Sequence, residues 1–420
     1  FLLIQGIGFQ PDSNSYIDNS ITRAPIYPLF IDFCRWFAGE SYLTAILLIQ
    51  LIFGFYSIIT FCFYIQKTFK IPLWLFYLLS LILFTPYLPD LAIGNFVLTE
   101  GLAYPMFLIV SKYLFRSVIM KSTRDAIIYF ILCIPLILIR GQFLFLYPVS
   151  ILLLIYLFIN AQNGKKRVIL LTVVFIVCVI TTDISERCYN YVEHSRFVKA
   201  PFTGIQLLTP ALFISDETDK EIFTDVAQRQ LFENWFEEMK NNKANINYPE
   251  QEGQVEVEHF LNKYNVICWQ IVAPSMSKAP LAKTETKDSW INFDKVATHM
   301  AISLIKDNWK GYIFLNSQNC IVGLSQIFFD NVKLTILLFW LLCYILIINL
   351  ILIIYGDNNP IYLFSFFVIV IHFTNLGAVS LVEPILVRYA FYTNVLIKVI
   401  IIFGVYYFLT SLRIPNKTVK

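Results

Sequence analysis

The chain has 420 residues, of which 57% are hydrophobic and only 15% are charged, and its formal net charge is +3. Soluble globular proteins average about 25% charged residues, so this composition excludes an ordinary soluble domain and indicates an integral membrane protein. The small net charge gives no reason to expect nucleic acid as a partner.

The chain starts in an apolar run, residues 1–9, that is too short to cross a membrane alone. A span needs about 20 apolar residues, so we interpret this run as the outer end of a first membrane helix that is truncated at its beginning. A polar loop follows, in which Pro25 and Pro28 fix the backbone φ angle and remove hydrogen-bond donors. The loop is therefore expected to be stiff.

Nine further apolar runs are long enough, or nearly long enough, to cross a membrane. We divide the almost continuous stretch 126–160 into two, because its length suits two spans better than one. With the truncated first run, the sequence predicts about ten transmembrane helices. The nine runs fall at residues 42–65, 71–86, 94–114, 126–140, 142–160, 167–183, 333–355, 361–381 and 391–412.

The basic residues follow alternate connections between these runs. The connection 86–95 contains no lysine or arginine, whereas basic residues collect at 67–70, 112–124, 165–167 and 413–420. Lysine and arginine are enriched in the cytoplasmic loops of membrane proteins, so this pattern predicts the orientation of the whole chain.

The predicted orientation divides the chain into three parts. Residues 1–183 form an N-terminal transmembrane module, whose first outer loop spans residues 10–41. Residues 184–332 form an extracytoplasmic domain, and residues 333–420 form the C-terminal transmembrane helices. Apolar residues recur at helical spacing within 222–239 and 293–308, so the extracytoplasmic domain is expected to be mainly helical. The predicted fold class is an all-α polytopic membrane protein.

Isolated charges gather at the predicted outer face. Glu100 is expected about two turns inside the run 94–114, and Arg140 lies at the turn between two spans. Ionisable residues in or beside membrane spans are costly, so a functional role is the default interpretation. The alternative is a structural ion pair between spans, for example Glu100 with Arg140. The charges concerned are Asp12, Asp18, Arg23, Glu100, Arg140, Glu383 and Arg388.

Arginine and carboxylate side chains at one membrane face suit phosphate recognition combined with acid-base chemistry. Arginines can form bidentate hydrogen bonds to a phosphate or a diphosphate. A carboxylate close by can accept a proton from an attacking hydroxyl. A lipid-linked donor would place its phosphate at this depth while its tail stays between helices. This combination predicts sugar transfer from a polyprenyl phosphate carrier.

Short motifs in the same order resemble the GT-C fold glycosyltransferases, in the branch related to protein mannosyltransferases and aminoarabinose transferases. Members of this branch often show an Asp, a Tyr and an Arg-x-Pro-x-Tyr-Pro-Leu run before the second span. The resemblance covers the membrane part, about two thirds of the chain. The motifs are Asp12-Ser13 with Tyr16, the run Arg23-Ala24-Pro25-Ile26-Tyr27-Pro28-Leu29-Phe30, Leu98-Thr99-Glu100-Gly101-Leu102, Leu138-Ile139-Arg140 and Arg388-Tyr389.

The resemblance implies an inverting transfer in which the Asp of the first loop deprotonates the acceptor. Carried over, Asp12 is the general base and Glu100 positions the acceptor or a cation. The residues expected to contact substrate, above all the donor phosphate for the arginines, are Arg23, Arg140 and Arg388, together with Asp18, Tyr16, Tyr27, Glu383 and Tyr389. Packing is the alternative role of Tyr27 and Tyr389.

The chain departs from the mannosyltransferase pattern at one place. It has Asp12-Ser13 where that group has paired acidic residues. This departure leaves the need for a divalent cation open, and Asp18 is then the second candidate for the base. We assign no residue as a metal ligand. A divalent cation is the one cofactor that stays open.

Two other functions stay open. One is a polysaccharide polymerase or ligase that uses a polyprenyl diphosphate donor, and the other is a lipid or sugar transporter. Transporters usually show repeated halves and charges near the membrane midplane, which this sequence lacks. The predicted partners are the lipid-linked sugar donor, membrane lipid and an acceptor that is a glycan, a lipid or a protein. The predicted location is the cytoplasmic membrane, as a multi-pass protein with its site on the periplasmic or extracellular side.

Overall fold

The computed structural model describes residues 2–160, 165–249, 253, 255–275, 286–327, 331–357 and 359–412. Helices are the regular elements of these residues, and a single parallel bridge joins Gly8 to Phe96. The all-helical fold class is confirmed for this part of the chain.

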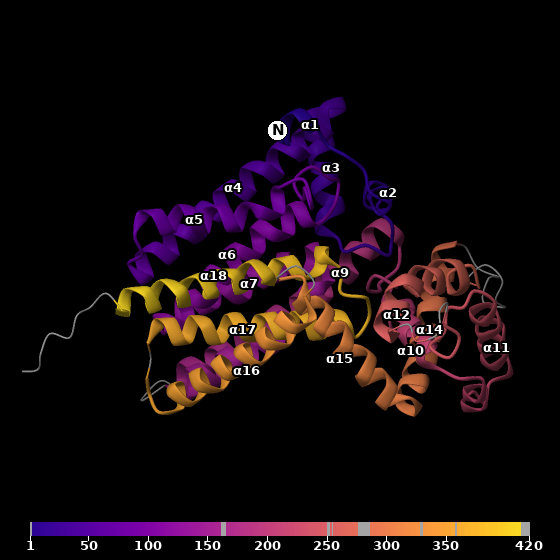
Figure 1. Ribbon diagram of the computed structural model, residues 1–420. Helices are drawn as coiled ribbons and strands as arrows, with labels where there is room; N and C mark the ends of the chain where they lie inside the picture. Colours follow the sequence, from indigo (N-terminus) through magenta and orange to yellow (C-terminus); the bar gives the residue numbers. More distant parts are fainter. Residues whose placement is uncertain are drawn as a thin grey trace, which may run out of the picture.

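The first half of the chain forms most of a helix bundle (Figure 1). Short helices α1 (Leu2–Gln5) and α2 (Ser13–Ile17) precede α3 (Ile26–Ala38), which a 3₁₀ turn at Gly39–Ser41 joins to α4 (Tyr42–Phe69). The helices that follow are α5 (Leu73–Phe84) with a 3₁₀ turn η2 (Thr85–Tyr87), α6 (Glu100–Ile119), α7 (Thr123–Ile139), η3 (Gly141–Phe145), α8 (Leu146–Ile159) and α9 (Lys165–His194).

The second half begins with a separate group of helices and returns to the bundle. The group consists of α10 (Thr203–Ile214), η4 (Glu217–Ile222), α11 (Val226–Asn241), α12 (Glu256–Asn265), η5 (Val266–Val272), α14 (Thr286–Asp307) and α15 (Trp309–Ser325). We call residues 203–325 the helical unit. The bundle is completed by α16 (Val332–Ile354), α17 (Pro360–Ser380) and α18 (Val387–Leu412).

Seven helical segments in the described part of the chain are long and apolar enough to cross a membrane. The structure is therefore that of a multi-pass membrane protein, as the composition predicts. Each of the nine predicted runs is largely helical, but α5 and α7 have only 12 and 17 residues. The first predicted run forms only the four-residue helix α1. The seven segments are Ile26–Phe69, Glu100–Ile119, Gly141–Ile159, Lys166–His194, Lys333–Ile354, Pro360–Ser380 and Val387–Thr410.

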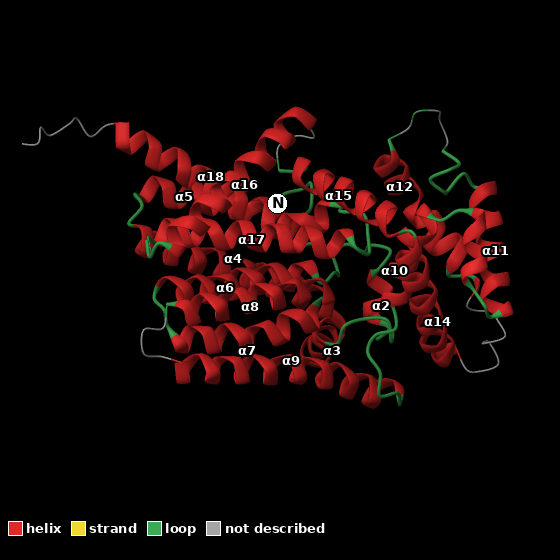
Figure 2. Ribbon diagram, turned by 90° about the horizontal axis from the view of Figure 1, so that it is seen from below, coloured by secondary structure: helices red, strands yellow, loops and turns green. Residues whose placement is uncertain are grey.

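Two groups of buried apolar side chains hold the structure together. One fills the bundle, and the other lies within the helical unit, where the aromatic side chains of α11 and α12 pack against α10 and α14. The helical unit lies beside one end of the bundle, next to α2 (Figures 1 and 2). The first loop and the helical unit therefore share the same end.

The start of α6 differs from the prediction. Residues 94–98 are not helical, because they pair with the first residues of the chain: the Gly8 N–H donates to the Asn95 carbonyl at 2.6 Å, and the Val97 N–H donates to the Gly8 carbonyl at 3.1 Å. The Asn95 side chain also donates to the Leu2 carbonyl at 2.6 Å. The placement of Glu100 two turns inside a helix is therefore wrong, and Glu100 is the first residue of α6.

Candidate active site at one end of the helix bundle

The first loop is fixed to the loop that precedes α6. The Ser13 side chain is fully buried, and its hydroxyl donates to the Val97 carbonyl at 2.9 Å. The same oxygen accepts from the Gln10 N–H at 2.8 Å, which closes the turn before α2. These bonds hold the turn that contains Asp12, directly before α2, against the loop that leads to Glu100 at the start of α6. The two acidic residues proposed for catalysis thus come from neighbouring loops.

Asp12 lies between two arginines from opposite ends of the chain. Its Oδ1 is 2.9 Å from Nη2 of Arg23, and its Oδ2 is 3.3 Å from Nη1 of Arg388. Burial alone would raise the pKa of Asp12, but the two guanidinium groups outweigh burial and lower that pKa below its ordinary value of 3.8. Asp12 is therefore a carboxylate at neutral pH, and each of its oxygens already accepts a charged hydrogen bond.

Arg23 is held by its own loop. Its Nε donates to the Ser15 hydroxyl at 2.7 Å, and its guanidinium carbon lies 4.7 Å from the ring centroid of Tyr16. A guanidinium over an aromatic face gains electrostatic attraction from the ring. Burial raises the pKa of the Tyr16 hydroxyl, so this phenol stays protonated and is a hydrogen-bond donor at neutral pH.

Glu100 and Arg140 form a buried ion pair. The distance from Glu100 Oε1 to Arg140 Nη1 is 2.6 Å, and their side chains are only 4% and 15% exposed. The Thr99 hydroxyl donates to Glu100 Oε2 at 3.1 Å and accepts from Arg140 at 3.2 Å. The ion pair that the sequence suggests as the structural alternative is thus present. Glu100 in this state is engaged with Arg140 and Thr99.

Tyr389 connects the two arginine sites. Its ring centroid is 4.9 Å from the guanidinium carbon of Arg140 and 5.0 Å from that of Arg388. The Tyr389 hydroxyl accepts a hydrogen bond from Arg388 Nη2 at 2.8 Å. Tyr389 therefore has the packing role expected as its alternative. It also directly contacts Arg140 and Arg388, two of the arginines expected to bind the donor phosphate.

The contacts join five predicted residues into one row: Asp12, Arg388, Tyr389, Arg140 and Glu100. Arg23 and Tyr16 lie beside Asp12. Nε of Arg388 is buried and has no hydrogen-bond partner among the described residues. A buried guanidinium donor without a partner is suited to an anionic ligand, because an unsatisfied charged donor is costly.

Three predicted residues lie outside this row. Asp18 is exposed at the end of α2. Tyr27 is buried beside Tyr16, with ring centroids 5.3 Å apart. The Glu383 side chain accepts a hydrogen bond from Gln206 of α10 and also interacts with the Tyr389 hydroxyl, so it lies between the row and the helical unit. Tyr27 thus packs against the site through Tyr16, and Glu383 connects the site to α10.

Gln50 of α4 explains why Tyr27 is fixed. The Tyr27 hydroxyl donates to Gln50 Oε1 at 3.0 Å, and Gln50 Nε2 donates to the carbonyls of Gly94 and Phe96 at 3.0 and 3.3 Å. This amide has room only because residue 101 of α6 is glycine. A Cβ at Gly101 would lie 2.4 Å from the Gln50 amide carbon.

We expect Gly101→Ala to destabilise the protein by about 1–3 kcal/mol, because the Gln50 amide must move and lose buried hydrogen bonds. The matched control is Gly377→Ala in α17, where an added Cβ would meet no atom within 4 Å. Alanine is the better helix former, so this control should stabilise by about 0.5–1 kcal/mol. Unfolding of the purified variants in detergent measures the difference. Equal stability of the two variants would contradict the role given to Gln50.

Some residues of the site have no counterpart among the sequence-based predictions. Ser15 orients Arg23, and Gln142 donates to the Tyr389 carbonyl at 2.7 Å and to Asn375 Oδ1 at 2.8 Å. Gln206, which contacts Glu383, lies in an otherwise apolar stretch. An isolated amide between apolar residues is the signal that could have indicated Gln206.

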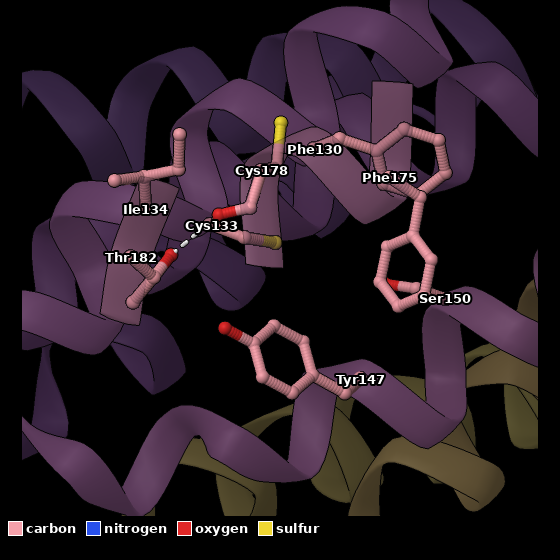
Figure 3. Close-up of a pocket in the computed structure, with 8 residues that line it drawn as sticks. All are labelled: Phe130, Cys133, Ile134, Tyr147, Ser150, Phe175, Cys178 and Thr182. Atoms are coloured by element: carbon pink, nitrogen blue, oxygen red, sulfur yellow. Dashed lines mark hydrogen bonds between the residues drawn. The ribbon is translucent and has the colours of Figure 1, made fainter. Parts of the chain in front are cut away.

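The described residues contain no group of three His, Cys, Asp or Glu side chains that could hold a metal ion. A separate recess lies between α7, α8 and α9 (Figure 3). Its lining is mostly apolar or weakly polar, and the predicted site residues take no part in it. The lining residues are Phe130, Cys133, Ile134, Tyr147, Ser150, Phe175, Cys178 and Thr182.

The fold and the row of charges define a helical, multi-pass membrane protein with a polar site at one end of its bundle. Comparison of the chain with models of protein families, with curated proteins and with solved structures found no match. Any function assigned to the protein therefore depends on the residues of the site themselves.

Proposed function

We propose that this protein is an inverting glycosyltransferase of the GT-C type, which transfers a sugar from a polyprenyl phosphate carrier to an acceptor hydroxyl. The observation that carries the proposal is the placement of Asp12 between Arg23 and Arg388, at 2.9 and 3.3 Å. In an inverting transfer the acceptor hydroxyl attacks the anomeric carbon from the face opposite the phosphate oxygen, so the base and the cations that bind the phosphate must lie at close range, on either side of one sugar carbon. Here the first loop, which carries Asp12 and Arg23, and the start of α18, which carries Arg388, bring them together.

The proposed reaction gives each group a role. The acceptor hydroxyl attacks the anomeric carbon, and the bond from that carbon to the carrier phosphate oxygen breaks. Asp12 takes the hydroxyl proton, and the electron pair of the broken bond stays on the lipid phosphate. Arg388, whose Nε has no partner in the described part of the chain, and Arg23 stabilise the charge of the departing phosphate.

In this proposal, binding of the sugar donor also changes the pKa of Asp12. In the unliganded state its pKa is held down by the same arginines that would bind the phosphate. When their hydrogen bonds turn to the phosphate oxygens, Asp12 loses much of this stabilisation and its pKa rises toward the ordinary value. The carboxylate becomes a better proton acceptor when the donor is in place.

Glu100 and Arg140 have a supporting role in this proposal. Their ion pair is nearly closed to solvent, and the Tyr389 ring lies between Arg140 and Arg388. Arg140 therefore supports the phosphate site by packing on the Tyr389 ring, and Glu100 keeps Arg140 in place. The outer face of a cytoplasmic membrane is the proposed location, because the connection 86–95 at this end contains no lysine or arginine, whereas basic residues collect at 67–70, 112–124 and 165–167.

The test is sugar transfer by the purified protein in lipid nanodiscs. A panel of polyprenyl monophosphate and diphosphate sugars is offered with a membrane extract as acceptor, and release of the lipid phosphate is measured. The proposal expects turnover of a monophosphate donor. Turnover of diphosphate donors alone would instead identify a polymerase or ligase, and the absence of both turnover and donor binding would reject the proposal.

A further inference from the structure

The segment between α17 and α18 is held by side chains of α15, the last helix of the helical unit, and of the residue that follows it. We call residues 381–386, which join α17 to α18, the α17–α18 segment. Tyr312 donates to the Leu381 carbonyl, Asn319 donates to the Glu383 carbonyl at 2.8 Å, and Gln326 donates to the Ile385 carbonyl at 2.7 Å. Tyr312 and Asn319 belong to α15, and Gln326 follows directly after it. The backbone of the segment is thus fixed from one side.

Asn319 is the centre of this contact. Its side chain is fully buried, and both ends of its amide are used: Nδ2 donates to the Glu383 carbonyl, and Oδ1 accepts from the Ile385 N–H at 2.9 Å. The Glu383 side chain is held in turn by Gln206 of α10. A buried amide that bridges two backbone groups of the same segment fixes both its position and its direction.

Close packing of α15 accompanies these bonds. A Cβ at Gly323 would lie 2.7 Å from Leu376 of α17 and 2.8 Å from Ile385. Glycine at this position lets α15 approach both α17 and the α17–α18 segment. Gln142 and Asn375 bind the Tyr389 carbonyl from the bundle side, at 2.7 and 3.1 Å. The backbone around Arg388 is therefore held by the helical unit on one side and by the bundle on the other.

Arg388 follows Ile385 by three residues and contacts Asp12, which lies 376 residues earlier in the chain. We propose that Asn319 is a positioning residue, which sets Arg388 against Asp12 and the lipid phosphate by fixing the α17–α18 segment. The inference rests on the phosphate role given to Arg388 under the proposed function. It also gives the helical unit a role, because the unit supports the phosphate site through α15.

The test measures binding of farnesyl phosphate to the full chain in nanodiscs, with farnesol as the neutral control of equal chain length. Arg388→Ala and Asn319→Ala are each expected to weaken binding of farnesyl phosphate about tenfold, and to leave farnesol binding unchanged. If Asn319 acts through Arg388, the double variant binds no more weakly than Arg388→Ala alone. A loss equal to the product of the two single losses would overturn the inference.

Asn245→Ala is the matched control for general damage to the helical unit. Asn245 is also a fully buried amide, and it bridges the carbonyls of Leu212 and Ser215 at 3.1 and 2.8 Å, within the helical unit. This variant should lose stability but keep its affinity for farnesyl phosphate. Equal weakening by Asn245→Ala and Asn319→Ala would show that Asn319 has only a structural role.

Two further results separate the possible failures. If Arg388→Ala weakens binding and Asn319→Ala does not, the positioning role is wrong and the proposed function stands. If Arg388→Ala has no effect, both are rejected. Tyr312→Phe gives a second route if Asn319→Ala does not fold, because it keeps the ring and removes the hydroxyl that donates to the Leu381 carbonyl. It should weaken binding severalfold, and unchanged binding would count against the inference.

Discussion

Replacing Asp12 with Asn is expected to slow sugar transfer by about 10²–10⁴-fold, which is the usual contribution of a general base. The same change should tighten binding of the carrier phosphate. Arg23 and Arg388 lose the carboxylate that lies 2.9 and 3.3 Å away, so an anionic ligand no longer competes with it. A slower reaction together with tighter donor binding is a signature that mere misfolding would not produce. Single-turnover rates and donor titrations measure the two effects separately.

Asp18→Asn provides the control for this experiment. Asp18 lies in the same loop but is exposed at the end of α2, outside the row of charges. We expect its transfer rate and donor affinity to match those of the unchanged protein. If Asp18→Asn slows transfer and Asp12→Asn does not, the base is Asp18, which is the second candidate that the sequence leaves open.

Removal of the Arg140 guanidinium, as in Arg140→Gln, is expected to destabilise the protein by about 3–5 kcal/mol. The reason is that Glu100, whose side chain is 4% exposed, would keep a buried charge without its partner at 2.6 Å. Adding Glu100→Gln should restore much of the stability, because a neutral amide does not need a counter-charge. The unfolding free energies of the single and double variants measure this coupling.

Arg35→Gln is the matched comparison for Arg140→Gln. Arg35 pairs with Asp32 at 3.2 Å on α3, and both side chains are more than a third exposed. Exposed pairs contribute about 0–1 kcal/mol, so this variant should be nearly as stable as the unchanged protein. A similar small loss for Arg140→Gln would mean that Glu100 finds another partner, or is protonated, when Arg140 is absent.

Much of the fold follows from local patterns in the sequence. The apolar runs predict the positions of α4 to α9 and of α16 to α18, because length and hydropathy are properties of each segment alone. The start of α6 is not predictable in this way. Residues 94–98 are apolar enough for a helix, but their backbone groups pair with residues near Gly8, and that pairing is not encoded in the segment itself.

The site was only partly predictable. The topology places Asp12 and Arg388 at one face, but it does not show that they touch, nor that Tyr389 lies between Arg140 and Arg388. Those contacts depend on how α18 packs against the first half of the chain. The supporting amides Gln50, Gln142 and Asn319 carry no charge and match no motif, so only their partners in the structure reveal what they do.

The fixed backbone around Asp12 and Arg388 affects the entropy of ligand capture. Ser13 holds the first loop, and Asn319 and Gln142 hold the residues around Arg388. An arginine side chain free in solvent loses about 0.5–1.5 kcal/mol of rotamer freedom when it is immobilised by a ligand. Here Asp12 already holds both guanidinium groups in place before any ligand arrives. An incoming anion exchanges one set of charged hydrogen bonds for another, so its binding should show a smaller entropic loss than capture by disordered arginines.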